Sequence, residues 1–215
     1  MLYLAALFIG CGFFIFFMTK ILLDNGHGVN TIGKMSPDGR LKEYAYTREI
    51  VRRVEELLKF KGYDVEKVTP EDIDVLIFER IKRVNEVCLK YGPSNVILIS
   101  IHNNAAGNDC QWHNAQGFIS IVSKNSSSRS KLLAAKLWEK AISLGMQGNR
   151  FVPPQKYIEQ NIAICRDTFC PAVLTECLFQ DNIDDVDYLL SEVGKMDITT
   201  LHVEAIQQYL KEVHE

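Results

Sequence analysis

Two of the five histidines stand directly after segments that are predicted to be buried strands. His27 follows the apolar run Ile21–Asp24, and His102 follows the run Asn95–Ile101. Glu176 ends a third run of apolar residues. In open α/β sheets, ligands bind outside the carboxyl ends of the strands. We therefore expect two imidazoles and one carboxylate to meet at one edge of a sheet.

Two imidazoles and a carboxylate around an open fourth position form the ligand set of a catalytic zinc ion. Zinc lowers the pKa of a coordinated water to about 7, so such a site supplies hydroxide at neutral pH. A second carboxylate must then accept the proton and pass it to the leaving nitrogen. The residue types alone offer four acidic candidates for these roles and do not rank them: Asp24, Glu43, Glu49 and Glu176.

The residues on either side of His27 are glycines, Gly26 and Gly28. Glycine adopts backbone angles that are forbidden to other residues, so we expect this pair to let the chain aim the imidazole into a cleft. The alternative is that each histidine only bonds a backbone carbonyl at a strand end. We favour a metal site because the two histidines occur in the same context, with carboxylates nearby.

Strand-like and helical segments alternate from Lys20 onward, which predicts an α/β domain built around a mainly parallel sheet. A helix is predicted over Glu43–Lys61, where apolar residues recur on one face and Gly62 follows as a stop signal. Thr69–Asp72 predicts the start of a second helix that runs to Tyr91. The other predicted elements are strands at Asp64–Val68, Gly117–Val122 and Ala172–Glu176, a helix from about Ser130 to Leu144, and a closing helix at Asp197–Val213.

Four short motifs, in this order, resemble those of the zinc-dependent N-acetylmuramoyl-L-alanine amidases of the amidase 3 type. The family's strand end Asp-Pro-Gly-His-Gly appears as Asp24–Gly28, with asparagine in place of proline, and the glutamate that opens its first long helix appears as Glu43. Its Ser-x-His-x-Asn strand end appears as Ser100–Asn104, and its late Leu-x-Glu strand as Leu174–Glu176. The similarity spans essentially all of Ile21–Glu215.

The resemblance implies a single domain with a twisted, mixed six-stranded sheet flanked by helices. It also implies hydrolysis of the amide between the lactyl group of N-acetylmuramic acid and L-alanine in peptidoglycan, and so an enzyme that acts on the cell wall. It assigns Glu176 as the catalytic carboxylate and three ligands to one Zn²⁺: His27, Glu43 and His102. The residues expected to contact substrate or to support the ligands are Arg150, Asn104 and Asp24, the last by orienting a ligand ring.

Two other functions remain open for the same residues. A zinc peptidase that cuts within the stem peptide of peptidoglycan would share the metal chemistry and differ in the amide it hydrolyses. A wall-binding protein that has lost catalysis is the alternative outside the enzymes, although all four reactive positions are filled.

The composition is that of an ordinary globular chain: 215 residues, 47% of them hydrophobic and 24% charged. Its 24 basic and 27 acidic side chains give a net charge of −3. A nucleic-acid-binding protein normally carries a basic excess, so no nucleic-acid partner is expected. We expect a monomer whose partner is peptidoglycan.

The N-terminal residues Met1–Thr19 contain no charged side chain. A helix of about 20 apolar residues can span a bilayer, so this run is just long enough. It lacks the basic region and the small-residue cleavage site of a signal peptide. We expect residues 20–215 to form the catalytic domain and Met18 to be the true start, with a membrane anchor as the alternative. Membrane contact is expected only through residues 1–19.

None of the six cysteines are spaced Cys-x-x-Cys, which argues against a structural zinc knot. We expect free buried thiols, as in proteins of a reducing cytoplasm. If the protein is exported, the alternative is a disulfide among the last three cysteines, Cys165, Cys170 and Cys177.

Overall fold

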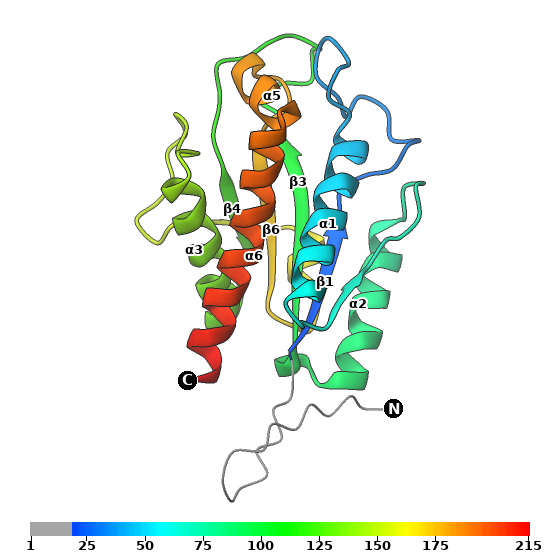
Figure 1. Ribbon diagram of the computed structural model, residues 1–215. Helices are drawn as coiled ribbons and strands as arrows, with labels where there is room; N and C mark the ends of the chain where they lie inside the picture. The colour runs from blue at the N-terminus through cyan, green and yellow to red at the C-terminus, as the bar shows by residue number, and fades with distance from the viewer. Residues whose placement is uncertain (1–18) are drawn as a thin grey trace, which may run out of the picture.

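The computed structural model describes residues 19–215, so the predictions for residues 1–18 lie outside the described part of the chain. The described residues form one six-stranded sheet with the order β2-β1-β3-β6-β4-β5 (Figure 1). β2, β1, β3 and β6 run parallel, β4 is antiparallel to β6, and β5 is parallel to β4. The predicted mixed, mainly parallel six-stranded sheet is confirmed. The strands are β1 (Lys20–Asn25), β2 (Val65–Lys67), β3 (Val96–Asn104), β4 (Ile119–Ser123), β5 (Ile158–Gln160) and β6 (Ala172–Phe179).

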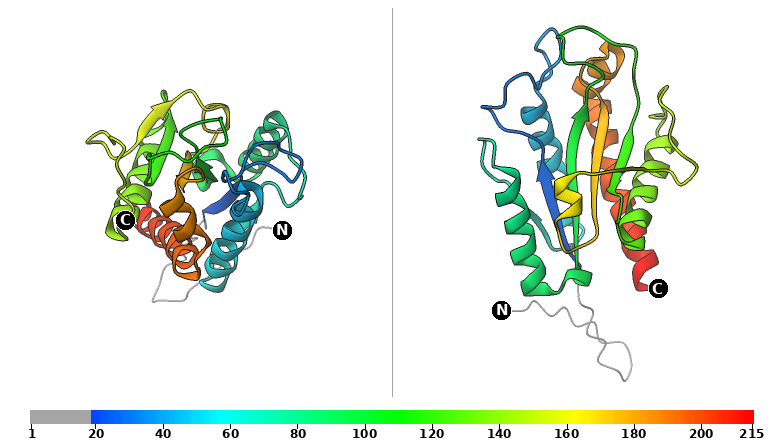
Figure 2. Two further views of the ribbon diagram at one scale, coloured as in Figure 1. Left: turned by 90° about the horizontal axis from the view of Figure 1, so that it is seen from above. Right: turned by 180° about the vertical axis from the view of Figure 1, so that it is seen from behind.

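Helices cover both faces of the sheet (Figures 1 and 2). One face packs against α1 (Glu43–Phe60), α3 (Ser128–Ser143), α5 (Ile183–Leu190) and α6 (Glu192–His214). The other face packs against α2 (Ile77–Tyr91) and α4 (Ala163–Arg166), and the short 3-10 helix η1 (Pro93–Asn95) connects α2 to β3. No helix among residues 19–215 is long and apolar enough to cross a membrane.

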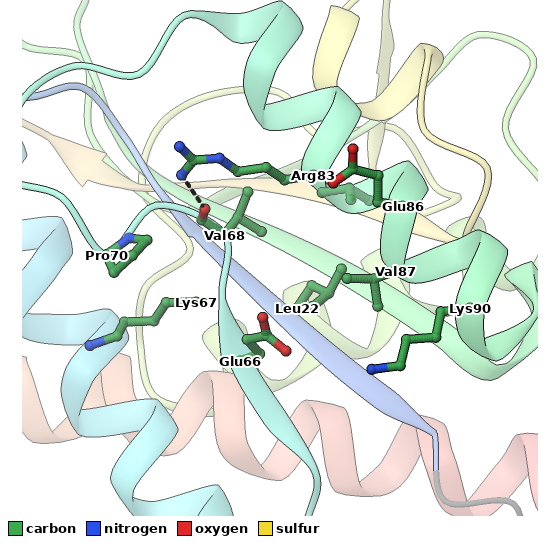
Figure 3. A pocket seen from close by; sticks show the side chains of 10 residues that line it. Leu22, Glu66, Lys67, Val68, Pro70, Arg83, Glu86, Val87 and Lys90 are labelled. Atoms are coloured by element: carbon green, nitrogen blue, oxygen red, sulfur yellow. Dashed lines mark hydrogen bonds between the residues drawn. The ribbon is translucent and has the colours of Figure 1, made fainter. Parts of the chain in front are cut away.

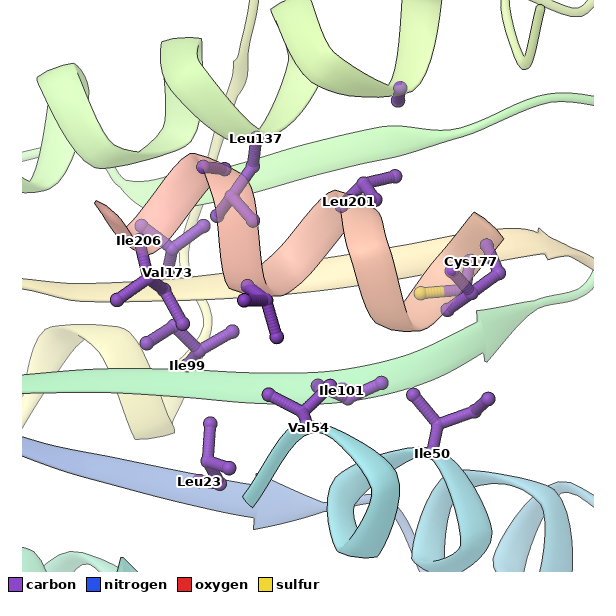
Figure 4. Packing of buried hydrophobic residues seen from close by; sticks show 14 of the residues in the cluster. Leu23, Ile50, Val54, Ile99, Ile101, Leu137, Val173, Cys177, Leu201 and Ile206 are labelled. Atoms are coloured by element: carbon purple, nitrogen blue, oxygen red, sulfur yellow. The ribbon is translucent and has the colours of Figure 1, made fainter. Parts of the chain in front are cut away.

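The sheet has a hydrophobic core on each face. Alternate residues of each strand pack into one core or the other, because successive side chains of a strand point to opposite faces. Leu23, Ile99 and Val173 pack toward α1 and α6, as Figure 4 shows. Leu22 and Leu98 belong to the core on the side of α2 and α4. The central strand β3 is therefore covered on both faces, which explains its unbroken apolar sequence.

The second helix begins later than its sequence predicts. α2 starts at Ile77, and the expected start near Pro70 is wrong. The preceding residues bond to the loop after β1 and to α1 instead: the Val29 N–H donates to the Asp72 carbonyl at 2.8 Å, and Arg48 Nη2 donates to the Glu71 carbonyl at 2.9 Å. These tertiary bonds outweigh the local helix-start signal.

The C-terminal region also differs from its prediction. α6 begins at Glu192, earlier than expected, and α5 precedes it. Two side chains cap these helices: Asn182 Oδ1 accepts from the Asp185 N–H, and Ser191 Oγ accepts from the Gly194 N–H. Both are residue types favoured at the N-cap, a local signal that predicts these starts. β5 and α4 were also absent from the predicted elements.

His202 of α6 is fully buried. Its Nδ1 lies 2.8 Å from the Ile198 carbonyl, and its Nε2 lies 3.0 Å from Thr175 Oγ1. Burial lowers the pKa of His202 to about 4, which keeps the ring neutral in the core. Its two ring nitrogens thus both have partners, as a buried polar group requires.

A cavity of about 360 Å³ lies between β2 and α2 (Figure 3). Its apolar wall includes Leu22 and Val87, and charged side chains such as Lys67 and Lys90 surround it. Arg83 Nη1 reaches across the cavity to the Val68 carbonyl at 3.0 Å. None of the predicted site residues lines this cavity.

Candidate active site

The loop that follows β1 carries His27 in a conformation that few residues adopt. His27 has a φ of 56°, in the left-handed region, whereas Gly26 and Gly28 do not have positive φ. A Cβ on Gly26 would lie 2.6 Å from His102 Nδ1, and a Cβ on Gly28 would lie 1.9 Å from the Asp74 backbone nitrogen. The glycines are therefore needed for space, and our expectation that they supply unusual backbone angles is wrong.

Glu43 stands between the two histidines at the first position of α1. Its Oε1 lies 3.1 Å from His102 Nδ1 and accepts a hydrogen bond from the Asn103 N–H at 3.0 Å. Its Oε2 lies 3.4 Å from His27 Nε2. One ligand atom from each of the three residues lies within 4.8 Å of the others, so the predicted ligand set is brought together. The imidazole rings meet edge to face, with centroids 5.1 Å apart.

The protonation of these groups follows from burial and from their mutual charges. Burial lowers the pKa of His27 to about 4, although the charge of Glu43 opposes this shift. Burial would also raise the pKa of Glu43, but its hydrogen bond to His102 and the charges of both rings outweigh that effect and lower it. His27 is therefore a neutral imidazole at neutral pH, which is the form that binds metals.

Glu176 lies on β6 opposite His102 of β3 in the strand register. Its Oε2 is buried and has no hydrogen-bond partner among the described residues. Burial, with a smaller contribution from the charge of Glu43, raises the pKa of Glu176 to about 7. A carboxyl group with such a pKa can both accept and release a proton near neutral pH.

A cavity of about 360 Å³ opens beside the two imidazoles. His27 and His102 lie on its wall, together with Leu174 of β6. Its other walls include the first turn of α2 and the start of α4. The two histidines therefore face a largely apolar cleft rather than the solid core.

Comparison with known proteins identifies the fold and the family. The profile of the N-acetylmuramoyl-L-alanine amidases matches residues 21–208. The chain belongs to the N-acetylmuramoyl-L-alanine amidase family. The predicted resemblance and the predicted class of enzyme are thus confirmed.

Two curated relatives of the amidase are the endolysin of Bacillus phage SPP1 and the probable cell wall amidase LytH of Staphylococcus saprophyticus. The endolysin is 25% identical over 196 residues, which cover 90% of this chain and 67% of the endolysin. LytH is 26% identical over 199 residues, which cover 89% of this chain and 58% of LytH. The chain therefore spans about three fifths to two thirds of the relatives' lengths.

The fold of the amidase is also that of solved structures. The N-acetylmuramoyl-L-alanine amidase from Clostridium difficile 630 superposes with a TM-score of 0.75 at 22% sequence identity, covering 90% of this chain and 97% of that one. The catalytic domain of CwlV from Bacillus (Paenibacillus) polymyxa gives a TM-score of 0.74 at 21% identity. At these identities the likeness establishes the fold alone.

Asp24 of the amidase is buried and has no hydrogen bond to His27 or His102. Its Oδ1 accepts from Arg80 Nη1 at 3.0 Å, and its Oδ2 accepts from Ser100 Oγ at 2.6 Å. Arg80 Nη1 also donates to the Asn25 carbonyl at 2.6 Å, and its Nη2 to Asp74 Oδ1 at 2.8 Å. Asp24 thus bonds to Arg80 and Ser100 in place of the expected histidine. Sequence reasoning missed Arg80, because nothing in its local sequence marks a buried arginine.

Asn104, Arg150 and Glu49 lie outside the group formed by the three predicted ligands. Asn104 ends β3, and its Oδ1 accepts from the Ala105 N–H at 2.9 Å. Arg150 is exposed, and its guanidinium lies 5.8 Å from the centroid of the Phe179 ring. The structure does not bring either residue into the three-residue ligand set. Glu49, an early carboxylate candidate, pairs instead with Arg53 at 2.7 Å on α1.

Lys34, which sequence reasoning also missed, places a positive charge near the site. After burial and the charges of Glu43 and His102, the charge of Lys34 acts to lower the pKa of His27. It also acts to lower the pKa of Glu176, against the upward effect of burial. Lys34 lies in the loop between His27 and Glu43, so the segment that joins two predicted ligands also supplies a cation.

Substitution of Gly26 tests the close approach of the loop after β1 to the His102 ring. We expect Gly26→Ala to displace that ring, because the added Cβ would lie 2.6 Å from Nδ1 and 2.7 Å from Cε1. A displacement of about 1 Å at a catalytic group can lower the rate by roughly 10²-fold. The measurement is the turnover of purified sacculi. Gly39→Asn is the matched control, since Gly39 has no atom within 4 Å of its added Cβ and asparagine tolerates its φ of 72°. Equal activity of Gly26→Ala and the wild type would show that the ring position is not critical.

Proposed function

We propose that this chain is a zinc-dependent amidase that hydrolyses the bond between the lactyl group of N-acetylmuramic acid and L-alanine in peptidoglycan. The observation that carries the proposal is the meeting of His27, Glu43 and His102, with Glu176 opposite in the strand register. These four residues come from separate elements, and the family's motifs place the same residue types in the same order.

The side chains fit a zinc ion. Two imidazoles and one carboxylate are the donors that zinc takes in catalytic sites, which keep a position open for water or substrate. Glu43 Oε2 is buried and has no hydrogen-bond partner within residues 19–215. A buried polar atom without a partner is costly, and a bound cation would satisfy it. When bound, zinc would supply Lewis-acid chemistry by polarising the amide carbonyl and lowering the pKa of a water.

Glu176 is assigned the proton transfers. Its carboxylate would take a proton from the attacking water and donate it to the amide nitrogen as the bond to L-alanine breaks. The raised pKa, which burial causes, suits a group that must both gain and lose a proton. The water attacks the carbonyl carbon, so the products are a carboxylate on the lactyl group and a free L-alanine amine.

The chain's own residues also hold the ligands in place. The Asn103 N–H donates to Glu43 Oε1, and His102 Nδ1 lies against the same oxygen, so the carboxylate is fixed from two sides. The buried Arg80 joins the end of β1 to the segment before α2 and thereby supports the loop that carries His27. We infer that Asn104 and Arg150 take part in binding the glycan or the stem peptide at the rim, and that the protein acts as a monomer.

Mass spectrometry of digested sacculi tests the choice of amide. We expect intact stem peptides that begin with a free L-alanine amine, together with glycan strands that have lost their peptides. Fragments cut within the stem would instead identify a peptidase. Sacculi that bind the protein and stay intact would show a wall-binding protein without catalysis. Either result would overturn the proposed reaction.

A further inference from the structure

Three thiols lie together in the core between α2, α4 and the sheet, outside the candidate active site. Cys88 of α2 is fully buried, and Cys165 and Cys170 are exposed by only 8% and 6%. All three belong to one cluster of buried residues. The proposed reaction uses none of them, so their proximity needs a separate account.

An asparagine fixes the two segments that carry Cys88 and Cys170. Asn85 Nδ2 donates to the Asp167 carbonyl at 2.9 Å, and the Phe169 N–H donates to Asn85 Oδ1 at 2.9 Å. Cys88 lies three residues beyond Asn85 on the same face of α2, since residues three apart on a helix are neighbours. Cys170 directly follows Phe169. The paired bonds therefore hold one turn of α2 against the chain that enters β6.

Cys88 and Cys170 belong to one buried cluster, and the paired bonds of Asn85 hold together the two segments that carry them. The Cys170 thiol is the largest cause of a lowered pKa for Cys88. Burial, by contrast, raises the pKa of Cys165 to about 12. The thiolate is the reactive form of cysteine, so the lowered pKa favours attack by the Cys88 thiol.

We propose that Cys88 and Cys170 form a disulfide when the chain meets a small-molecule disulfide such as oxidised glutathione. The new bond joins the two Sγ atoms, and both thiols lose their protons. The two electrons pass to oxidised glutathione, whose own sulfur–sulfur bond breaks to give two molecules of the reduced thiol. A chain that works at the cell wall enters the kind of compartment where such bonds form and persist.

The cross-link would tie together two walls of the cleft. α2 contributes Ile77 and Arg80 to the cavity beside the histidines, and β6 contributes Leu174. A bond from Cys88 to the chain just before β6 joins these elements covalently. It also closes a long loop, which lowers the conformational entropy of the unfolded chain and so stabilises the folded protein.

Oxidation of the full chain by oxidised glutathione tests the proposal. After blocking of free thiols in denaturant and proteolysis, mass spectrometry should find the Cys88 peptide joined to the Cys170 peptide. The midpoint of urea unfolding should rise on oxidation and return on reduction. In Cys88→Ser and Cys170→Ser both effects should vanish, whereas in Cys165→Ala both should remain.

Several outcomes would overturn the disulfide. In the first, Cys88 and Cys170 of the oxidised wild type still react with the thiol-blocking reagent, so both thiols stayed free. In the second, the disulfide joins Cys170 to Cys165. In the third, the cysteines carry glutathione and no disulfide within the protein forms. The cross-linked peptide is sought in the wild type, so the test does not depend on whether the serine variants fold. No readout depends on amidase activity, so failure of the disulfide proposal is distinguishable from failure of the proposed reaction.

Discussion

We expect Glu176→Gln to hydrolyse sacculi about 10²–10⁴-fold more slowly than the wild type, because a general acid–base group usually contributes a factor of this size to the rate. Glutamine keeps the size of the side chain but cannot carry a proton from water to the leaving nitrogen. Glu176 is not one of the three grouped ligand residues, so the zinc content of the variant should equal that of the wild type. The measurements are the rate of release of L-alanine amines from sacculi and the metal content of the same preparation.

Glu49→Gln is the matched control for this substitution. Glu49 was an acidic candidate from the sequence, but it pairs with Arg53 of α1 at 2.7 Å and with Lys195 of α6 at 3.1 Å. The control should retain the activity of the wild type. If Glu176→Gln were equally active with normal zinc content, the proton transfers would have to be assigned to another group.

Glu43→Gln is expected to lower the affinity for zinc, and with it the activity. The substitution removes the negative charge that lies 3.4 Å from His27 Nε2 and 3.1 Å from His102 Nδ1. Changing groups that only surround metal ligands typically costs about 10–100-fold in affinity, so loss of a charged ligand should cost more. A competition titration with a coloured chelator measures the dissociation constant directly.

Glu56→Gln on the same helix controls for the loss of one acidic side chain. Glu56 is exposed and pairs with Arg52 at 3.0 Å, one helical turn away. The Glu56→Gln protein should therefore bind zinc as tightly as the wild type. The thermal unfolding of both variants shows whether the fold persists. A Glu43→Gln protein that binds zinc as tightly as the wild type would remove Glu43 from the ligand set.

The elements that carry the site were predictable because their signals are local. β3 is a continuous apolar strand, and α1 begins at Glu43, where the sequence places the start of its first helix. The polar residues at the ends of β1, β3 and β6 follow from the rule that parallel strands present their carboxyl ends to one edge. The meeting of His27 and His102 at one edge of the sheet was therefore accessible before any coordinates, whereas the choice of Glu43 as the third ligand came from the family resemblance.

The features that could not be predicted from the sequence depend on contacts between segments that are distant along the chain. The start of α2 is displaced by bonds to Val29 and Arg48, which no local propensity encodes. Arg80 is buried because Asp24, Asp74 and two backbone carbonyls surround it, and these partners lie up to 56 residues away. The need for glycine at position 26 arises from the His102 ring, which is positioned by another strand. Each of these features requires the tertiary structure.

The most direct test of the metal site is the zinc content of the purified chain, measured together with its activity on sacculi before and after chelation. We expect about one zinc ion per chain, loss of both zinc and activity on treatment with a strong chelator, and recovery of both when zinc is returned. Full hydrolysis of sacculi by a chain shown to contain no divalent metal would contradict the account.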